Sequence, residues 1–386
     1  MKKARSAKSK SNLTAEKRKK ASTPKTPKKS TKDVKDDQID AITFKAGTKF
    51  NDDFIIVEKI GKGAYGQVYS CKNAKNAKET VALKAEAHVE KAGCAIKIER
   101  QVLNIIQSRS YADHIAMCYN AAKRKNFSYM IMTLMGKSLK DVQKGMGGKK
   151  NFHLSTWIRI GIQALYGLKT LHDNGFVHRD VKPANFALGV GTDQEKATIV
   201  HVLDFGLSRN YCYPIDDEEQ MPNDEVAAGV PTRWQCRVVR PRVRLRGTAR
   251  YCSPNAHDHV EQGRRDDIWS LMYMLIDFHC GLPWSGSFEV VKKMKDSFKD
   301  SALMINMPEE LADILPGLRK LDCYARPDYR FIYKRFLAVM QRNVIQLEDR
   351  YDWEPKNKKL VRPRLLPEWY DAEDFFLDDP IGDLDP

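Results

Sequence analysis

The sequence of 386 residues has no long hydrophobic run, and this absence excludes a membrane-spanning helix. A bilayer span needs about 18 or more consecutive apolar residues, and no such stretch occurs. The first 35 residues also lack an apolar segment, so the sequence predicts no secretory signal peptide. Internal repeats are absent as well. Since 42% of the residues are hydrophobic, the chain can still bury a large core, in one domain or in two lobes.

Paired cysteines are missing too. The eight cysteines form no C-x-x-C pair and show no regular spacing. This scatter argues against a disulfide framework and against a zinc site, and it favours a reducing compartment. We therefore expect a cytoplasmic or nuclear protein. We also expect a monomer that does not contact a membrane.

Positive charge is concentrated at one end of the chain. The net charge is +16, and residues 1–35 hold 14 Lys/Arg against 2 Asp/Glu, which gives 14 − 2 = +12 and leaves +4 for the rest. Because large apolar side chains are almost absent there, we predict a disordered basic tail over residues 1–45. Its charge fits nucleic acid, an acidic surface or a nuclear import receptor, and composition does not choose among them. Residues 366–386, in contrast, carry eight acidic groups and no basic one.

Short apolar runs predict a small lobe, mostly β, over residues 50–134. Five segments are typical of strands, and they cover residues 54–57, 67–69, 81–84, 115–119 and 129–134. One helix is expected after Gly93, because apolar residues recur at helical spacing from Ala95 to Ile106.

Helical periodicity then predicts a larger lobe over residues 135–350. Ser155 is the expected N-cap of a long helix that ends at Asn174 and Gly175. Further helices are expected over residues 268–278, 308–319 and 328–345. A hinge near residues 133–137 places a ligand cleft between the two lobes. The remaining residues, 351–386, form a C-terminal extension that ends in the acidic segment.

A glycine-rich stretch lies between the first two strands, with Gly61, Gly63 and Gly66 in a G-x-G-x-x-G pattern. The pattern alone is weak, since a dinucleotide-binding turn has the same letters. That turn must open a helix, whereas Gly66 is followed by Gln-Val-Tyr, which is typical of a strand. The stretch therefore predicts a flap over phosphates, where glycine lets the backbone approach anionic oxygens. A purely structural hairpin is the alternative.

Lys84 ends a Val-Ala-Leu-Lys strand, and Glu99 follows fifteen residues later in the expected helix. An ion pair between the two would hold the lysine ammonium on nucleotide phosphates. Glu86 and Glu90 lie nearby, so an exposed position for Glu99 is the competing interpretation. Apolar neighbours at helical spacing favour a buried Glu99.

The most specific string runs H-R-D-V-K-P-A-N from His178 to Asn185, and L-D-F-G follows with Asp204. Asp180 is placed to accept the proton of an incoming hydroxyl, and Lys182 is placed to neutralise phosphoryl oxygens. Asn185 and Asp204 supply oxygen ligands for Mg²⁺. Phosphoryl transfer needs in-line positioning and charge neutralisation, and these groups provide both.

With these motifs in order, residues 50–350 resemble a eukaryotic protein kinase. The narrower resemblance is to the casein kinase 1 superfamily and, within it, to the tau-tubulin kinase branch. Three passages carry it: G-T-A-R-Y-C-S-P-N-A-H from Gly247, R-D-D-I-W-S-L from Arg265, and the closing motifs R-P-D-Y from Arg326 and Y-D-W-E from Tyr351. The resemblance covers about three-quarters of the chain.

This resemblance implies a bilobal α+β fold with a β-rich N-lobe (50–134) and a helical C-lobe (135–350). It implies ATP and Mg²⁺ as cofactors and Ser/Thr of proteins as the acceptor, which Lys182 also suggests. Met132 takes the gatekeeper position, and Asp267 takes that of the buried carboxylate that anchors the catalytic loop. The residues implied to contact nucleotide are Ile60, Gly61, Gly63, Gly66, Val68, Ala82, Lys84, Met132, Leu134 and Met135. For the apolar ones, a role in the core alone is an equal alternative.

The chain departs from the family pattern mainly in length, with 44 residues from Asp204 to Thr248. Residues 233–250 contain seven arginines and no acidic side chain. The resemblance assigns an anion of the substrate to Arg250, with Arg246 nearby, so we expect acidic or already phosphorylated protein substrates. Alternatively, the arginines pair with acidic segments of this chain, and residues 366–386 could then act as a pseudosubstrate.

Smaller departures are Ala184, where the family has an acidic residue, and Pro254, where the branch has an apolar one. Neither position is expected to be catalytic. Three rival functions each account for part of the sequence. A catalytically weak kinase-fold scaffold, targeted by the basic tail, would lack a catalytic group, and every such group is present. A small-molecule phosphotransferase would not need the long activation segment, and a basic nucleic-acid-binding protein would explain only residues 1–35.

Overall fold

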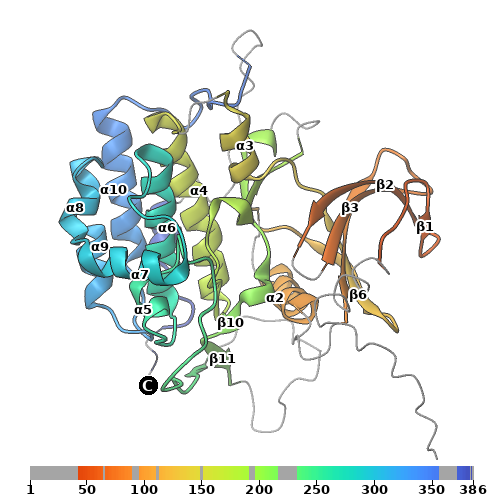
Figure 1. Ribbon diagram of the computed structural model, residues 1–386, viewed down its shortest axis with the longest axis horizontal. Coiled ribbons are helices and arrows are strands. Elements are labelled where there is room, and N and C mark those ends of the chain that lie inside the picture. Colours follow the sequence, from red (N-terminus) through yellow and green to blue (C-terminus); the bar gives the residue numbers. More distant parts are fainter. Residues whose placement is uncertain are drawn as a thin grey trace, which may run out of the picture.

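The computed structural model describes residues 42–63, 66–88, 95–109, 113–147, 151–190, 196–215, 233–355, 372–382 and 384. These residues form a sheet-rich lobe and a larger helical lobe (Figure 1), so the predicted bilobal fold is confirmed. Within the described part of the chain, no helix combines the length and the apolar content that a bilayer span requires.

The sheet-rich lobe contains one antiparallel sheet of six strands in the order β1-β2-β3-β4-β6-β5. The strands are β1 (Lys49–Phe50), β2 (Phe54–Lys62), β3 (Gly66–Asn73), β4 (Thr80–Ala87), β5 (Cys118–Lys123) and β6 (Phe127–Thr133). Alternation in β4 places Leu83 and Ala85 in an outer apolar cluster and Ala82 in the main core that continues into the helical lobe. The sheet therefore presents one apolar face toward the helical lobe.

The N-terminal boundary of this lobe lies earlier than predicted. Ile42 is 1% exposed, and the ring centroid of Phe44 lies 5.4 Å from the ring centroids of both Phe50 and Tyr69. Residues 42–45 thus belong to the folded lobe and not to the tail predicted over 1–45, because Ile42 and Phe44 pack in the outer apolar cluster. The predicted disorder of residues 1–41 lies outside the described residues.

Helix α2 (Ala95–Arg109) packs between the sheet and the helical lobe (Figure 1). The strand predicted over residues 115–119 is shifted: β5 starts at Cys118. Ile115 and Ala116 are buried because the chain crosses toward the helical lobe there, where Ile115 bridges to Val202. Burial explains the apolar run, and β5 itself is a mostly exposed edge strand with a polar sequence.

The helical lobe is built around α4 (Leu154–Asp173) and α6 (Arg264–His279), which pack against each other. The other helices are α3 (Leu139–Gly145), α5 (Pro254–His257), α7 (Phe288–Ser297), α8 (Asp300–Met304), α9 (Ile314–Lys320), α10 (Tyr329–Arg342) and α11 (Ala372–Leu377). Short strand pairs join β7 (Phe176–Val177) to β10 (Arg209–Asn210), β8 (Phe186–Leu188) to β9 (Val200–Val202), and β11 (Cys212–Pro214) to β12 (Trp234–Cys236).

Two helix predictions were wrong in detail. The N-cap of α4 is His153, whose ring accepts a hydrogen bond from the Ser155 backbone, so Ser155 already lies inside the helix. The helix predicted over 308–319 is divided into a 3-10 turn, η4 (Glu309–Leu311), and α9. The C-terminus of α4 follows the prediction, with Asn174 as its C-cap and Gly175 at φ +83°.

Candidate functional site

Three charged side chains meet where the two lobes face each other. Lys84 in β4 donates a hydrogen bond to Glu99 Oε2 in α2 at 2.6 Å and another to Asp204 Oδ1 at 3.0 Å. Glu99 is 1% exposed, so the exposed alternative considered for it is wrong. Asp204 sits just before η3 (Phe205–Leu207) with φ +64°, and its carboxylate accepts a hydrogen bond from Lys84 of the sheet-rich lobe.

The charges of this cluster shift the pKa values of its members. Burial lowers the pKa of Lys84, but the carboxylates of Glu99 and Asp204 outweigh it and hold the pKa above its ordinary value. The Lys84 ammonium lowers the pKa of Asp204. Burial raises the pKa of the Glu99 carboxyl, and Lys84 opposes the rise. Lys84 therefore stays charged, as a group that binds phosphate oxygens must.

The glycines of the G-x-G-x-x-G stretch have different structural roles. A Cβ on Gly63 would meet nothing closer than 3.8 Å, so this glycine leaves open space above the backbone. A Cβ on Gly66 would lie 2.2 Å from the Ala85 carbonyl oxygen, so glycine is required there by strand packing. Gly61 pairs with Val68 across β2 and β3. The loop tip, Ala64 and Tyr65, lies outside the described residues.

Most of the apolar residues implied to contact nucleotide lie in one cluster. Ala82 and Met132 are buried in the main core, and Val68, Leu134 and Met135 pack against it. Ile60, in contrast, is 46% exposed at the edge of β2. An exposed isoleucine beside a glycine flap is a surface that an adenine ring would cover.

The catalytic-loop candidates form a connected network. Lys182 Nζ donates to Asp180 Oδ2 and, at 3.1 Å, to Thr248 Oγ1. Thr248 in turn donates to Asp180 Oδ1 at 2.8 Å. Asn185 Nδ2 donates to the Asp180 carbonyl oxygen at 2.9 Å. Both carboxylate oxygens of Asp180 are thus held in a defined orientation by side chains from two separate segments.

The backbone of this loop is anchored from below. Asp267, 1% exposed in α6, accepts hydrogen bonds from the backbone N–H groups of His178 at 2.6 Å and Arg179 at 2.8 Å. His178 Nδ1 accepts from the Asp180 backbone N–H, so its Nε2 carries the proton and donates to Leu203 O at 3.0 Å. The anchor role implied for Asp267 agrees with this geometry.

The oxygen donors fit a magnesium ion that arrives with a nucleotide. Among the described residues, no group of three or more His, Cys, Asp or Glu side chains is arranged to hold a metal alone. Asn185 uses its amide N–H group on Asp180, which leaves its Oδ1 as an acceptor, and Asp204 supplies a carboxylate. Mg²⁺ typically takes one or two such protein oxygens and completes its shell with phosphate and water.

The two arginines expected to bind a substrate anion differ in their partners. Arg250 Nη2 lies 2.6 Å from Asp277 Oδ1, and its Nη1 donates to the Trp284 carbonyl oxygen. Its charge is therefore balanced within the chain. Arg246 lies near Arg179, where its positive charge helps to lower the Arg179 pKa.

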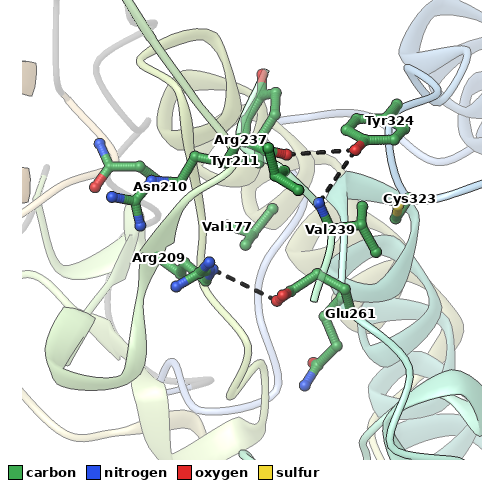
Figure 2. Close-up of a pocket in the computed structure, with 11 residues that line it drawn as sticks. Val177, Arg209, Asn210, Tyr211, Arg237, Val239, Glu261, Cys323 and Tyr324 are labelled. Atoms are coloured by element: carbon green, nitrogen blue, oxygen red, sulfur yellow. Dashed lines mark hydrogen bonds and ion pairs between the residues drawn. The ribbon is translucent and has the colours of Figure 1, made fainter. Parts of the chain in front are cut away.

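A cluster of four arginines surrounds one carboxylate on the activation-segment side of the catalytic loop. Glu261 lies 2.6 Å from Arg240 and 3.5 Å from Arg209, and Figure 2 shows Arg209 pointing toward it across a surface recess. Burial, followed by the charge of Arg209, lowers the pKa of Arg179 to about 10, and Arg240 and Arg246 add to the effect. We call these four arginines the arginine cluster; with Glu261 its net charge is +3.

The described residues of the acidic C-terminal segment pair with basic groups outside the arginine cluster. Its Glu373 lies 3.0 Å from Arg330 and 3.2 Å from Lys334, both in α10. Asp379 lies 3.4 Å from Arg326. The ion pairs of its described residues therefore do not support the pseudosubstrate hypothesis, because they involve Arg326 and α10 and none of the four clustered arginines.

Comparison with known proteins gives the family. The model of the protein kinase domain matches residues 54–335. The chain belongs to the protein kinase family. A Caenorhabditis elegans protein named a "putative serine/threonine-protein kinase" is 36% identical over 320 residues, 82% of this chain and 86% of that protein. Another from the same organism, named an "inactive tau-tubulin kinase", is 37% identical over 271 residues, 69% of this chain and 89% of that protein.

Sequence reasoning about this kinase missed three residues of the site. Thr248 belongs to the G-T-A-R-Y string, which by itself indicates no role for it, and the structure shows that it hydrogen-bonds to Asp180. Asp277 and Glu261 are the other two, and they determine which arginines have their charges balanced within the chain. A signal for Asp277 was present, since an acidic residue in the nearly apolar stretch of α6 needs a buried partner. The residues around Glu261 in the sequence give no indication of its role.

Proposed function

We propose that this kinase transfers the γ-phosphoryl group of ATP to serine or threonine hydroxyls of proteins, with Mg²⁺ as cofactor. The observation that carries the proposal is the network of Asp180, Lys182, Asn185 and Thr248 opposite the Lys84 cluster. Two relatives are named serine/threonine kinases, including a Dictyostelium discoideum protein that is 32% identical over 317 residues, 81% of this chain and 59% of that protein.

Each group has a step in the proposed reaction. Lys84, held by Glu99, binds the nucleotide phosphates, and the apolar cluster around Ala82 receives the adenine. Mg²⁺, when bound by Asn185 and Asp204, neutralises charge on the phosphates. Asp180 accepts the proton of the incoming hydroxyl, and Lys182 stabilises negative charge on the transferring group. Thr248 leaves Asp180 when the substrate hydroxyl replaces its hydrogen bond.

Labelled ATP and a mixture of protein substrates test the proposal. The Asp180→Asn variant should transfer label about 10²- to 10⁴-fold more slowly than wild type, because an amide cannot accept the proton. Asp313→Asn, the same change at an exposed position on the helical lobe, is the matched control and should keep full activity. If folded wild type with ATP and Mg²⁺ never labels a protein, the scaffold alternative replaces the kinase proposal.

We further assign the chain to the casein kinase 1 superfamily and the tau-tubulin kinase branch. The G-T-A-R-Y and R-D-D-I-W-S-L strings support this, as does the 37% identity to a relative with tau-tubulin kinase in its name. We also propose that the protein is a monomer in the cytoplasm or the nucleus. Residues 1–35 are proposed to contact nucleic acid or an acidic surface. Salt-dependent binding of a peptide of residues 1–35 tests the last of these.

Acidic or phosphorylated protein substrates are the proposed preference, and the arginine cluster is their proposed site. Its net positive charge beside Asp180 favours an anionic side chain near the acceptor. A peptide library should show preference for acidic or phosphorylated positions, and Arg246→Ala should weaken it. Arg335→Ala, far from the cluster, is the matched control. A library with no such preference refutes this assignment and leaves the phosphoryl transfer untouched.

A further inference from the structure

The described part of the C-terminal extension, residues 372–382 and 384, is called here the C-terminal segment. It packs behind the catalytic loop. Phe376 is completely buried, with its ring centroid 4.5 Å from that of Tyr166 in α4. Ile381 is 8% exposed and shares an apolar cluster with Val177, the residue before the catalytic-loop string. The segment is therefore part of the folded lobe, although it lies beyond the residues that the family model matches.

Arg326, from the R-P-D-Y motif, connects this segment to the lobe. Its Nη2 donates to the carbonyl oxygens of Asp378 at 2.6 Å and Phe376 at 3.3 Å. Its Nε lies 3.4 Å from Asp379 Oδ2. The guanidinium is thereby held 5.0 Å from the ring centroid of Tyr329, at the start of α10. Three contacts from the segment thus fix one guanidinium over one tyrosine.

Tyr329 begins a chain of buried hydrogen bonds that ends at the catalytic loop. Its hydroxyl lies 2.7 Å from His172 Nδ1, and His172 Nε2 lies 2.9 Å from Asp267 Oδ2. Asp267 accepts the backbone N–H groups of His178 and Arg179. Because the Asp267 carboxylate is an acceptor, His172 Nε2 carries the proton, and Nδ1 accepts from the Tyr329 hydroxyl. Every link in this chain has a defined donor and acceptor.

We propose that the C-terminal segment positions the catalytic loop, acting through Arg326, Tyr329 and His172 on Asp267. These are positioning residues, since none of them contacts a reacting atom. The segment supports activity where an inhibitory tail would suppress it. The effect on rate rests on the proposed kinase function, whereas the effect on the loop's structure does not.

Steady-state kinetics on the full chain and on a chain ending at residue 365 test the effect on rate. Loss of the segment should lower kcat about tenfold, because a small displacement of Asp180 misaligns the hydroxyl. KM for ATP should change less than about twofold, since Lys84 and the glycine stretch lie in the other lobe. A peptide of residues 366–386, added to the truncated chain, should restore kcat. A higher kcat after truncation overturns the proposal.

Point variants of the full chain separate positioning from folding. Tyr329→Phe removes only the hydroxyl and should lower kcat in the same direction as truncation. When Tyr329→Phe is combined with truncation, the fold-reduction of kcat should be smaller than the product of the two separate reductions. Both changes act through the same hydrogen bond between Tyr329 and His172. Asp379→Asn should give a smaller loss. Asp374→Asn, an exposed change of the same type in α11, is the matched control and should behave as wild type.

Amide hydrogen exchange reads the loop directly and does not depend on activity. In the truncated chain and in Tyr329→Phe, exchange of the backbone N–H groups over residues 177–180 should be about tenfold faster than in the parent chain. Unchanged exchange there overturns the proposal, even if kcat falls. If the wild type transfers no phosphate but exchange changes as expected, the kinase function fails and the positioning role stands.

Discussion

Asp267 makes the sharpest prediction of the structure, because its buried carboxylate is the common acceptor of the catalytic loop. Its oxygens receive the N–H groups of His178 and Arg179 and of the His172 ring, at 2.6, 2.8 and 2.9 Å. Arg179 has φ +67°, a left-handed conformation that costs a non-glycine residue about 1–2 kcal/mol. The Asp267 carboxylate therefore offsets the backbone strain at Arg179 and also orients the loop. We predict that Asp267→Asn damages both stability and catalysis.

The size of the effect follows from the contacts. Asparagine keeps one acceptor oxygen but turns an N–H group toward a backbone or histidine donor. Hydrogen bonds to a charged group contribute about 1.5–3 kcal/mol each, and at least one is lost here. A buried donor is also left without a partner, so the free energy of unfolding should fall by about 3–5 kcal/mol. Displacement of the loop should lower kcat by about 10²-fold.

Asp266→Asn is the matched control, one residue earlier on α6. Asp266 is also 1% exposed and accepts three hydrogen bonds, but from Ser253, Asn255 and the Gly263 backbone at the end of the activation segment. It should cost similar stability in urea denaturation while leaving kcat within about tenfold of wild type. Equal losses of kcat in both variants would contradict a specific anchor. So would an Asp267→Asn protein as stable as wild type.

Further predictions concern backbone geometry and pH. Gly247 has φ +101°, and a Cβ there would lie 2.4 Å from the Arg179 carbonyl oxygen, so Gly247→Ala should lower kcat and the melting temperature together. Burial lowers the pKa of His114 to about 3, from an ordinary 6.5. Between these two pH values His114 binds a proton in the unfolded chain but not in the folded chain. Stability should accordingly fall as pH drops below about 6.5, by about 2 kcal/mol at pH 5. Urea denaturation at pH 7 and pH 5 checks this, and His114→Gln should reduce the difference.

The parts of the fold that could be predicted from the sequence are those determined by residues close together in the chain. The glycine stretch, the strands around it and the strings that hold Asp180 and Asp204 depend on residue types at fixed short spacings. The Lys84–Glu99 pair joins two elements fifteen residues apart, which is close enough for helical periodicity to orient one partner. Boundaries were less predictable, as the shift of β5 to Cys118 illustrates, because an apolar run has the same letters whether it pairs in a sheet or crosses a core.

The partners of Arg250 show what sequence could not give. Its motif predicts an anion at this position, and an anion is present, but it is Asp277 of the same chain, 27 residues away. Glu261 plays the same part for Arg240 and Arg209. Such pairings depend on how helices and loops come together in three dimensions. The number of arginines in a segment therefore predicts a positively charged surface but does not predict its net charge.

The position of the acidic segment follows from the relative sizes of two energies. Charge alone pairs it with the arginine cluster, yet an exposed ion pair contributes only about 0–1 kcal/mol. Burying a phenylalanine or isoleucine side chain contributes about 1.5–3 kcal/mol, and the segment buries both Phe376 and Ile381. Phe376 therefore packs against Tyr166 of α4 and Tyr333 of α10, and Ile381 packs in the cluster of Val177 and Tyr211. The acidic residues Glu373 and Asp379 pair with the basic groups beside these sites. Since Glu373 and Asp379 pair with Arg330, Lys334 and Arg326, these described acidic residues leave the net positive charge of the arginine cluster unchanged.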